Sequence, residues 1–332
     1  MKILVTGGTG YIGSHICVEL LNVGHEVVVI DDFSNSKPDV LDSIKTITGK
    51  SVSFYEANVL DEEKTEQIFI DHKIDAIIHC AAFKAVGESV AKPIEYYTNN
   101  LMSTLVMTKM MKKYQVNNIV FSSSATVYGD PEVVPLTEDC KLGETTNPYG
   151  TSKAMMERIL IDVQKAVPSM SVTLLRYFNP IGAHESGLIG ENPNGIPNNL
   201  MPYIVKVATG ELPELGVFGD DYPTHDGTGV RDYIHVVDLA KGHVLAIEKY
   251  QEPGVHICNL GTGTGYSVLD IVKTFERVNN IKVPYSIKDR RPGDIATCYA
   301  DPTRAKVELG WVAEKGLEEM CRDSFQYVLK NK

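Results

Sequence analysis

The sequence contains few of the features that mark proteins built on disulfides, zinc, membranes or nucleic acids. Its six cysteines form no C-x-x-C pair and none of its nine histidines belongs to an H-E-x-x-H motif, so disulfide frameworks and the common zinc sites are not expected. No apolar run approaches the roughly 18 residues that a membrane span needs. With 43 acidic and 32 basic residues, the net charge of -11 leaves no basic face for nucleic-acid phosphates. We expect a soluble, cytoplasmic protein without metal, membrane or nucleic-acid partners.

The 332 residues, 43% of them hydrophobic, are enough for a large core and two domains. Strands are predicted near 2–6, 26–30, 51–56, 74–80, 117–123 and 171–178, and helices near 11–22, 61–72, 93–113 and 149–166. Their alternation indicates an α/β fold with a Rossmann-type, doubly wound parallel sheet. From about Phe178 onward, stretches rich in Gly, Pro and Asn predominate. We therefore predict a first domain over 1–178 and a smaller, loop-rich C-terminal lobe over 179–332, some of whose strands and helices can return to the first domain.

A glycine-rich loop follows the first predicted strand. Gly7, Gly10 and Gly13 stand between that strand and a helical pattern, the context in which amides at a helix N-terminus bind a pyrophosphate. The second predicted strand ends in Asp31 and Asp32, about 20 residues further on, where an acid accepts from ribose hydroxyls and repels a 2′-phosphate. This pattern predicts a dinucleotide site that favours NAD over NADP.

Tyr149 and Lys153 lie four positions apart, directly after Pro148, a residue that favours the first turn of a helix. This spacing places the phenol and the ammonium on one helical face. A tyrosine with a pKa near 10 is a poor base at pH 7, and we expect the nearby cation to lower that pKa. Ser124, at the end of the fifth predicted strand, offers a hydroxyl that can hydrogen-bond an oxygen undergoing oxidation. The three residues predict a catalytic set.

On these motifs the whole chain resembles the extended short-chain dehydrogenase/reductase superfamily, most closely its UDP-hexose 4-epimerases. The resemblance implies a UDP-sugar substrate, interconversion of UDP-galactose and UDP-glucose by transient oxidation at the sugar 4-position with bound NAD, and a homodimer. The alternatives are a nucleotide-sugar 4,6-dehydratase, another NAD-dependent short-chain dehydrogenase, and a catalytically silent NAD-binding regulator. Relatives that dehydrate carry acidic residues just after the serine or threonine of the fifth strand, where this chain has Ala125 and Thr126. The sequence leaves the preferred sugar and the physiological direction open.

The resemblance also implies which residues bind the cofactor. Besides Gly7, Gly10, Gly13, Asp31, Asp32, Tyr149 and Lys153, they are Tyr11, Ile12, Asn35, Ser36, Asn58, Val59, Ala81, Lys84, Asn99 and Phe178. Lys84 is the expected additional cation near the cofactor. Asn58 departs from the family pattern, since many relatives have an aspartate there, but its amide oxygen can still accept from the adenine amino group.

For the UDP-sugar, the resemblance implies contacts from Ser124, Asn179, Asn199, Leu200, Phe218, Arg231, Arg291, Asp294 and Cys298. Arg231 and Arg291 are expected to bind the diphosphate, because guanidinium groups pair bidentately with phosphate oxygens. Phe218 is expected against uracil and Asp294 at the uridine ribose. In relatives a bulky residue at the position of Cys298 closes the sugar pocket, whereas a small one leaves room for an N-acetyl group. We therefore expect UDP-N-acetylhexosamines to be accepted as well.

Overall fold

The computed structural model describes residues 1–332 apart from 194, 196 and 292. They form two compact units. The first consists of Met1–Gly129, Leu142–Arg176 and Ala240–Cys258, and the second of Asp130–Lys141, Tyr177–Leu239 and Asn259–Lys332. The chain thus leaves the first unit twice before its last exit, after Gly129 and after Arg176, and returns to it at Leu142 and at Ala240. The second of these exits lies two residues before the predicted boundary at 178.

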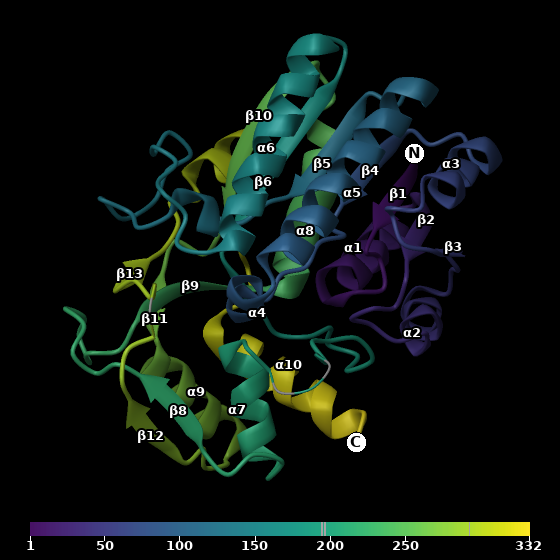
Figure 1. The fold of residues 1–332 in the computed structure, drawn as a ribbon. Helices are drawn as coiled ribbons and strands as arrows, with labels where there is room; N and C mark the ends of the chain where they lie inside the picture. Colours follow the sequence, from purple (N-terminus) through teal and green to yellow (C-terminus); the bar gives the residue numbers. More distant parts are fainter. Residues whose placement is uncertain (194, 196, 292) are drawn as a thin grey trace. The chain divides into compact units, whose positions relative to one another are not determined.

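A seven-stranded sheet forms the centre of the first unit (Figure 1). Its strands are β1 (Lys2–Thr6), β2 (Glu26–Asp31), β3 (Ser53–Glu56), β4 (Ala76–His79), β5 (Asn118–Ser122), β6 (Ser171–Tyr177) and β10 (Gly254–Leu260). They lie in the order β10-β6-β5-β4-β1-β2-β3, and the neighbours from β6 to β3 are parallel. The winding reverses between β1 and β4, the kind of switch point at which open α/β sheets bind ligands. The predicted Rossmann-type sheet and its six predicted strands are confirmed.

Helices connect these strands. They are α1 (Tyr11–Asn22), α2 (Asp39–Thr48), α3 (Glu62–Asp71), α4 (Val86–Ala91), α5 (Pro93–Tyr114), α6 (Pro148–Ala166) and α8 (Val236–Lys249), with a short 3-10 helix η1 (Ala125–Tyr128) after β5. α5 packs against α3 and α6, whereas α1 packs against α2. The four predicted helices are confirmed, but α2 and α4 were not predicted. α2 buries only Ile44 and contains several β-branched residues, which lower its helix propensity.

The core of the first unit explains why its strands are continuous apolar runs. Leu4, Val28, Ile77, Ile119 and Val172 come from five neighbouring strands, and each is at most 1% exposed. A strand covered by helices on both faces needs apolar residues at successive positions rather than in alternation. Burial on both faces therefore holds the sheet rigid and leaves its carboxyl edge for function.

The second unit contains two smaller sheets. β9 (Val230–His235) lies in one with β7 (Asn179–Ile181), β11 (Gly265–Ser267) and β13 (Thr297–Cys298), and β8 (Leu215–Phe218) pairs in parallel with β12 (Tyr285–Lys288). Helices α7 (Leu200–Ala208), α9 (Val268–Asn279) and α10 (Leu317–Lys330) share a core around Ile204, Phe275 and Phe325. A further short helix, η2, spans Ala305–Leu309. Among the described residues, no helix is long and apolar enough to cross a membrane.

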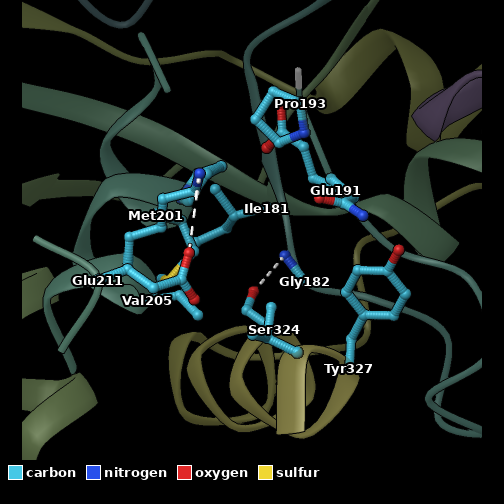
Figure 2. A pocket seen from close by; sticks show the side chains of 13 residues that line it. Ile181, Gly182, Glu191, Pro193, Met201, Val205, Glu211, Ser324 and Tyr327 are labelled. Carbon is cyan, nitrogen blue, oxygen red and sulfur yellow. Dashed lines mark hydrogen bonds and ion pairs between the residues drawn. The ribbon is translucent and has the colours of Figure 1, made fainter. Parts of the chain in front are cut away.

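A small cavity lies within the second unit beside β7, α7 and α10 (Figure 2). Met201, Val205 and Tyr327 line it, and the Ser324 hydroxyl there accepts a hydrogen bond from the Gly182 amide at 3.0 Å. Its volume of about 110 Å³ is well below the roughly 300 Å³ at which ligand pockets begin. None of the residues expected to bind substrate lines this cavity, so we assign it to imperfect packing between the two helices.

Gly13→Ala is expected to destabilise the first unit. A Cβ atom at Gly13 would lie 2.1 Å from the Gly7 carbonyl oxygen, and that backbone atom cannot move without distorting the loop after β1. We expect the free energy of unfolding, measured by urea denaturation, to fall by about 3 kcal/mol or more.

The matched control is Gly87→Ala in α4, where an added Cβ atom would meet nothing within 4 Å. Its free energy of unfolding should stay the same or rise by up to about 1 kcal/mol, because alanine is the better helix former. Equal losses in the two variants would contradict the close approach in the loop.

Candidate active site

Helix α6 places Tyr149 and Lys153 one turn apart at its N-terminal end. The helix begins at Pro148, and the Asn147 side chain caps it by accepting from the Gly150 amide at 2.9 Å. Tyr149 and Lys153 are only 7% and 2% exposed. A capped start fixes the first turns of the helix, so both side chains have defined positions in the first unit.

Ser124 meets Tyr149 at the end of β5. Its side chain caps η1 by accepting from the Thr126 amide at 3.2 Å and from the Thr126 hydroxyl at 3.0 Å. The Ser124 hydroxyl also hydrogen-bonds the Tyr149 phenol. The structure thus brings Ser124 and Tyr149 into contact. Sequence analysis did not assign Thr126 a part in this site, because no sequence motif marks a threonine whose hydroxyl donates to a nearby serine.

Lys153 faces the same strand end through its ammonium group. Nζ donates to the Ser122 carbonyl oxygen at 2.7 Å and lies 4.7 Å from the centre of the Phe121 ring. Burial lowers the pKa of Lys153 to about 8, against smaller opposing effects of Cys80 and Glu157. The charged form is therefore costly here, and any anion that approaches it is strongly stabilised.

Lys153 by itself does not lower the pKa of Tyr149 in this arrangement, and the lowering expected from Lys153 together with an oxidised nicotinamide stays a prediction. Burial raises the pKa of Tyr149 above its ordinary value of 10.0, and the hydrogen bond with Ser124 only partly opposes that effect. Desolvation disfavours the phenolate, while the Lys153 ammonium donates to a backbone carbonyl. The four-residue spacing along the helix indicates a nearby cation but does not reveal the cost of burying the phenolate.

The loop between β1 and α1 has the shape of a phosphate cradle. Gly7 adopts a positive φ of 70°, and α1 begins after Gly10 with no side chain capping its amides. A Cβ atom at Gly10 would approach only the Gly7 carbonyl, at 3.3 Å, so one side of the loop is open. Uncapped amides at a helix N-terminus bind anions. These residues fit the pyrophosphate of a dinucleotide.

Asp31 organises the neighbouring loop after β2. One carboxylate oxygen accepts from the Thr9 amide at 3.1 Å, and the other accepts from the Ser36 hydroxyl at 3.3 Å. The Thr9 and Ser36 hydroxyls are 2.7 Å apart. The carboxylate thus lies between the glycine loop and the segment after β2, where sequence analysis placed the adenosine ribose.

Asp32 and Asn58 are joined directly. The Asn58 amide donates to Asp32 at 2.7 Å, and its side-chain oxygen accepts from the Leu60 amide at 2.9 Å. Burial raises the pKa of Asp32, but hydrogen bonds from Ser34 and Asn58 outweigh it and lower the pKa overall. Asp32 is therefore anionic, and the Asn58 oxygen already has one donor when it meets any further group.

Most of the other residues predicted around the cofactor lie at the same edge of the first unit. Lys84 Nζ is 5.5 Å from the centre of the Tyr11 ring, and the Ala81 amide donates to the Thr6 hydroxyl beside Gly7 at 3.1 Å. Asn99 donates to Asn100 on α5. Ile12 is half-buried, Val59 is buried and Asn35 is exposed, while Phe178 belongs to the second unit.

The residues predicted to bind substrate form two groups in the second unit. Phe218, at the end of β8, lies 4.9 Å below the guanidinium of Arg291, which also pairs with Asp294 at 2.9 Å. Arg231 on β9 stands beside Cys298 of β13 in register.

Tyr233 on β9 links these two groups. Burial raises its pKa to about 12, and Arg231, Arg291 and Asp294 all act on it electrostatically. Sequence analysis missed Tyr233, although it stands two residues after Arg231 on the same strand and therefore on the same face.

The remaining predicted residues begin elements of the second unit. Asn179 starts β7 opposite Tyr233. Asn199 precedes α7, which begins at Leu200, and its side chain donates to Glu191 at 2.8 Å instead of capping the helix. The first amides of α7 therefore have no side-chain cap.

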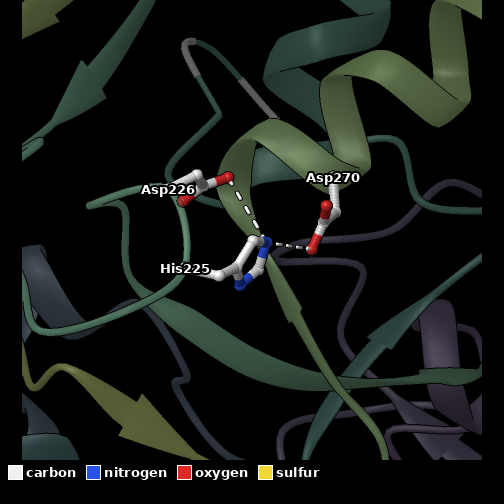
Figure 3. Close-up of side chains that lie close together, drawn as sticks. All are labelled: His225, Asp226 and Asp270. Atoms are coloured by element: carbon white, nitrogen blue, oxygen red, sulfur yellow. Dashed lines mark ion pairs between the residues drawn. The ribbon is translucent and has the colours of Figure 1, made fainter.

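His225, Asp226 and Asp270 form a separate cluster in the second unit (Figure 3). His225 Nε2 lies 3.6 Å from Asp226 and 3.2 Å from Asp270. Both carboxylates already accept from the N-cap residue of α9, Asp226 from the Ser267 hydroxyl and Asp270 from the Ser267 amide. We assign the cluster to holding the start of α9, in agreement with its capping box.

Comparison with known proteins gives the family of the chain. Residues 3–261 match the model of the NAD dependent epimerase/dehydratase family. The chain belongs to this family. It is 63% identical to a UDP-glucose 4-epimerase of Pasteurella multocida and 62% identical to one of Bacillus subtilis, each over 100% of this chain and 98% of the relative.

Solved structures of this epimerase/dehydratase family agree. A UDP-glucose 4-epimerase from Bifidobacterium longum in complex with NAD+ and UDP has a TM-score of 0.97 at 57% identity, covering 100% of this chain and 99% of that one. A UDP-Glc/GlcNAc 4-epimerase from Campylobacter jejuni has a TM-score of 0.86 at 32% identity, covering 99% of each chain. The predicted resemblance is confirmed, and the dehydratase alternative is not favoured.

The buried ammonium predicts a pH dependence of stability. Because burial lowers the pKa of Lys153 to about 8 from 10.5, the unfolded chain holds a proton between these pH values that the folded protein has released. Stability then rises with pH through this window. The wild-type free energy of unfolding, relative to that of Lys153→Met, should rise by up to about 1.4 kcal/mol per pH unit.

Urea denaturation of both proteins, freed of nucleotide, at pH 7.5, 8.5 and 9.5 measures this difference. Titrating groups distant from Lys153 contribute alike to both proteins and cancel, whereas His79 and Cys80, which interact with Lys153, have pKa values of about 3 and about 11 that lie outside this pH range. A difference that stays constant or falls with pH would contradict a depressed pKa of Lys153.

Proposed function

We propose that this protein is a UDP-glucose 4-epimerase that interconverts UDP-galactose and UDP-glucose with bound NAD. The observation that carries the proposal is the contact between Ser124 and Tyr149, one helical turn from Lys153, at the carboxyl edge of a dinucleotide-type sheet. Relatives 63% and 62% identical to this chain, and a solved structure at 57% identity, are UDP-glucose 4-epimerases.

The protein's own residues handle the proton and the position of the sugar. Tyr149 accepts the proton of the sugar 4-hydroxyl and later returns it, and Ser124 holds the same oxygen. NAD, when bound, would supply the reversible acceptor of hydride from the sugar 4-position and, when oxidised, a second positive charge. Two cations are needed because burial alone raises the pKa of Tyr149.

NAD would be held by the glycine loop between β1 and α1 and by residues near it in the first unit. The glycine loop and the N-terminus of α1 bind the pyrophosphate, and Asp31 and Asp32 lie at the adenosine ribose. Lys84 and Asn99 would also lie near the cofactor. An anionic pair at the ribose disfavours a 2′-phosphate by direct repulsion, which selects NAD over NADP.

The second unit would hold the nucleotide of the substrate. Arg231 and Arg291 bind the diphosphate, which gives this acidic protein local positive charge. Asp294 accepts from the uridine ribose, and Phe218, 39% exposed, offers its ring to uracil. A firmly held nucleotide and a loosely held hexose allow the oxidised 4-keto sugar to turn and present its other face.

Tyr149→Phe should abolish turnover without loss of NAD. Removal of a general acid-base group lowers kcat by about 10²- to 10⁴-fold, and the ring still fills its buried place. The measurement is conversion of UDP-galactose to UDP-glucose by purified protein with no added cofactor, together with NAD extracted from the denatured protein.

Tyr114→Phe is the matched control, since it removes a phenol of the same unit that donates to Glu66 on the surface. It should retain wild-type turnover. Unchanged turnover in Tyr149→Phe would remove Tyr149 from the acid-base role. Wild-type activity that requires added NAD and accumulates NADH would instead identify an ordinary dehydrogenase.

We further propose that UDP-N-acetylglucosamine and UDP-N-acetylgalactosamine are substrates. Cys298 is buried, and burial raises its pKa to about 11, so it is a small, neutral thiol beside Arg231. Cys298→Tyr should lose N-acetylhexosamine turnover by at least about tenfold and retain UDP-galactose turnover, since a clash selects against the larger sugar.

Cys258→Ala is the control for this series, because Cys258 is a fully buried thiol of the first unit with no assigned contact to the sugar. It should leave the ratio of the two activities unchanged. Wild-type protein inactive on both N-acetylated sugars would exclude the proposal.

We also propose a cytoplasmic homodimer. α5 and α6 pack side by side (Figure 1) and carry Met102, Leu105 and Met155, each between 41% and 44% exposed. Apolar side chains exposed on two adjacent helices suit a helical interface with a second copy of the chain.

A further inference from the structure

A buried ion pair lies one helical turn after Lys153, between α6 and β6. Glu157 is on α6, four residues after Lys153, so it shares the helical face of Tyr149 and Lys153. It is 1% exposed, and Arg176, near the end of β6, is 3% exposed. Arg176 pairs with the carboxylate bidentately, Nε donating to Oε1 at 3.0 Å and Nη2 donating to Oε2 at 2.7 Å. The reaction as proposed above makes no use of this pair.

The same carboxylate accepts a hydrogen bond from the strand end that carries Ser124. Ser123 Oγ donates to Oε1 of the carboxylate at 2.6 Å. On either side of it, the Ser122 carbonyl accepts from Lys153 at 2.7 Å, and Ser124 hydrogen-bonds Tyr149. Three consecutive serines are therefore tied to α6 at one-turn intervals. Contacts spread along two turns fix the angle between strand and helix as well as their distance.

Arg176 also contacts Tyr128, at the end of the short helix η1 that follows Ser124. Arg176 Nη1 donates to the Tyr128 phenol at 3.2 Å, and the guanidinium lies 5.0 Å from the centre of that ring. Tyr128 ends η1, which begins directly after Ser124. The pair thus binds the residue before Ser124 and the helix that follows it.

We propose that Glu157, with Arg176, is a positioning residue of the epimerase reaction that sets the placement of the Ser124 hydroxyl relative to the Tyr149 phenol. This inference rests on the proposed function. Glu157 does not touch the reacting atoms but acts through Ser123 and through the helix that it shares with Tyr149. A hydroxyl misplaced by about 1 Å costs on the order of 10²-fold in rate.

Stability alone does not explain the presence of this ion pair. A buried ion pair adds little net stability compared with apolar residues of the same volume, so the pair is poorly explained as a source of stability. Its three donors come from β5 and β6 and converge on one helix position. Such a connection restricts how the strand ends can be placed relative to α6, and therefore how Ser124 is placed relative to Tyr149.

The first test removes the hydrogen bond and leaves the ion pair. In Ser123→Ala we expect kcat for UDP-galactose to fall about tenfold or more, with the KM and the bound NAD unchanged. Ser171→Ala is the matched control: Ser171 is a buried serine of the same unit whose hydroxyl donates to the Tyr250 carbonyl at 2.7 Å. It should lose a similar amount of thermal stability and keep kcat within about twofold of wild type.

The second test is the pH profile of Glu157→Gln. The ionisable groups around Lys153 are Tyr149 and Glu157 on α6, and His79 and Cys80 at the end of β4. Loss of the negative charge makes the ammonium less stable. We expect the alkaline limb of kcat against pH to move to lower pH, with NAD retained. A structural defect would scale kcat at every pH without moving the limb.

The outcomes separate this inference from the function on which it rests. Equal kcat in Ser123→Ala and Ser171→Ala, with active wild type, overturns the positioning role alone. Folded Glu157→Gln with wild-type kcat and an unshifted profile overturns it as well. Wild type without epimerase activity overturns the proposed function. If Glu157→Gln does not fold, the comparison of the two serine variants decides.

Discussion

Buried hydrogen bonds between the end of β5 and the first turns of α6 fix the geometry on which the site depends. The strand end offers one carbonyl and two hydroxyls, and the helix offers an ammonium, a carboxylate and a phenol. Each of these polar groups is costly to bury unless it is paired. The pairing therefore allows only one relative placement of strand and helix, and that placement brings Ser124 to Tyr149.

The electrostatics of the site follow from the same burial. Desolvation raises the pKa of Tyr149 and lowers the pKa of Lys153, so burial shifts both groups toward their neutral forms before any charge enters. A base needed at neutral pH thus depends on charge brought by a ligand. In a chain of net charge -11, positive charge is available only where particular side chains are placed. Lys153 in the first unit and the two arginines of the second unit, Arg231 and Arg291, supply positive charge in this way.

Much of the fold could be predicted from the sequence because its signals are local. Runs such as Ile3 to Val5 and Val27 to Ile30 indicate strands covered on both faces, and the confirmed sheet has them there. β10 could not be placed, since its neighbour β6 is distant in sequence and nothing local reveals the pairing. α2 and α4 bury one residue each, and the β-branched residues of α2 lower its helix propensity.

The sequence by itself determined six strands and four helices of the first unit, the glycine loop and the shared helical face of Tyr149 and Lys153, since these depend on the residue's own neighbours. Only the tertiary structure decided which groups surround each buried charge. Lys153 donates to a carbonyl of β5, Glu157 accepts from β5 and β6, and Tyr149 is desolvated. A pKa depends on all charges and solvent within several ångströms, and spacing along one helix describes only one of them.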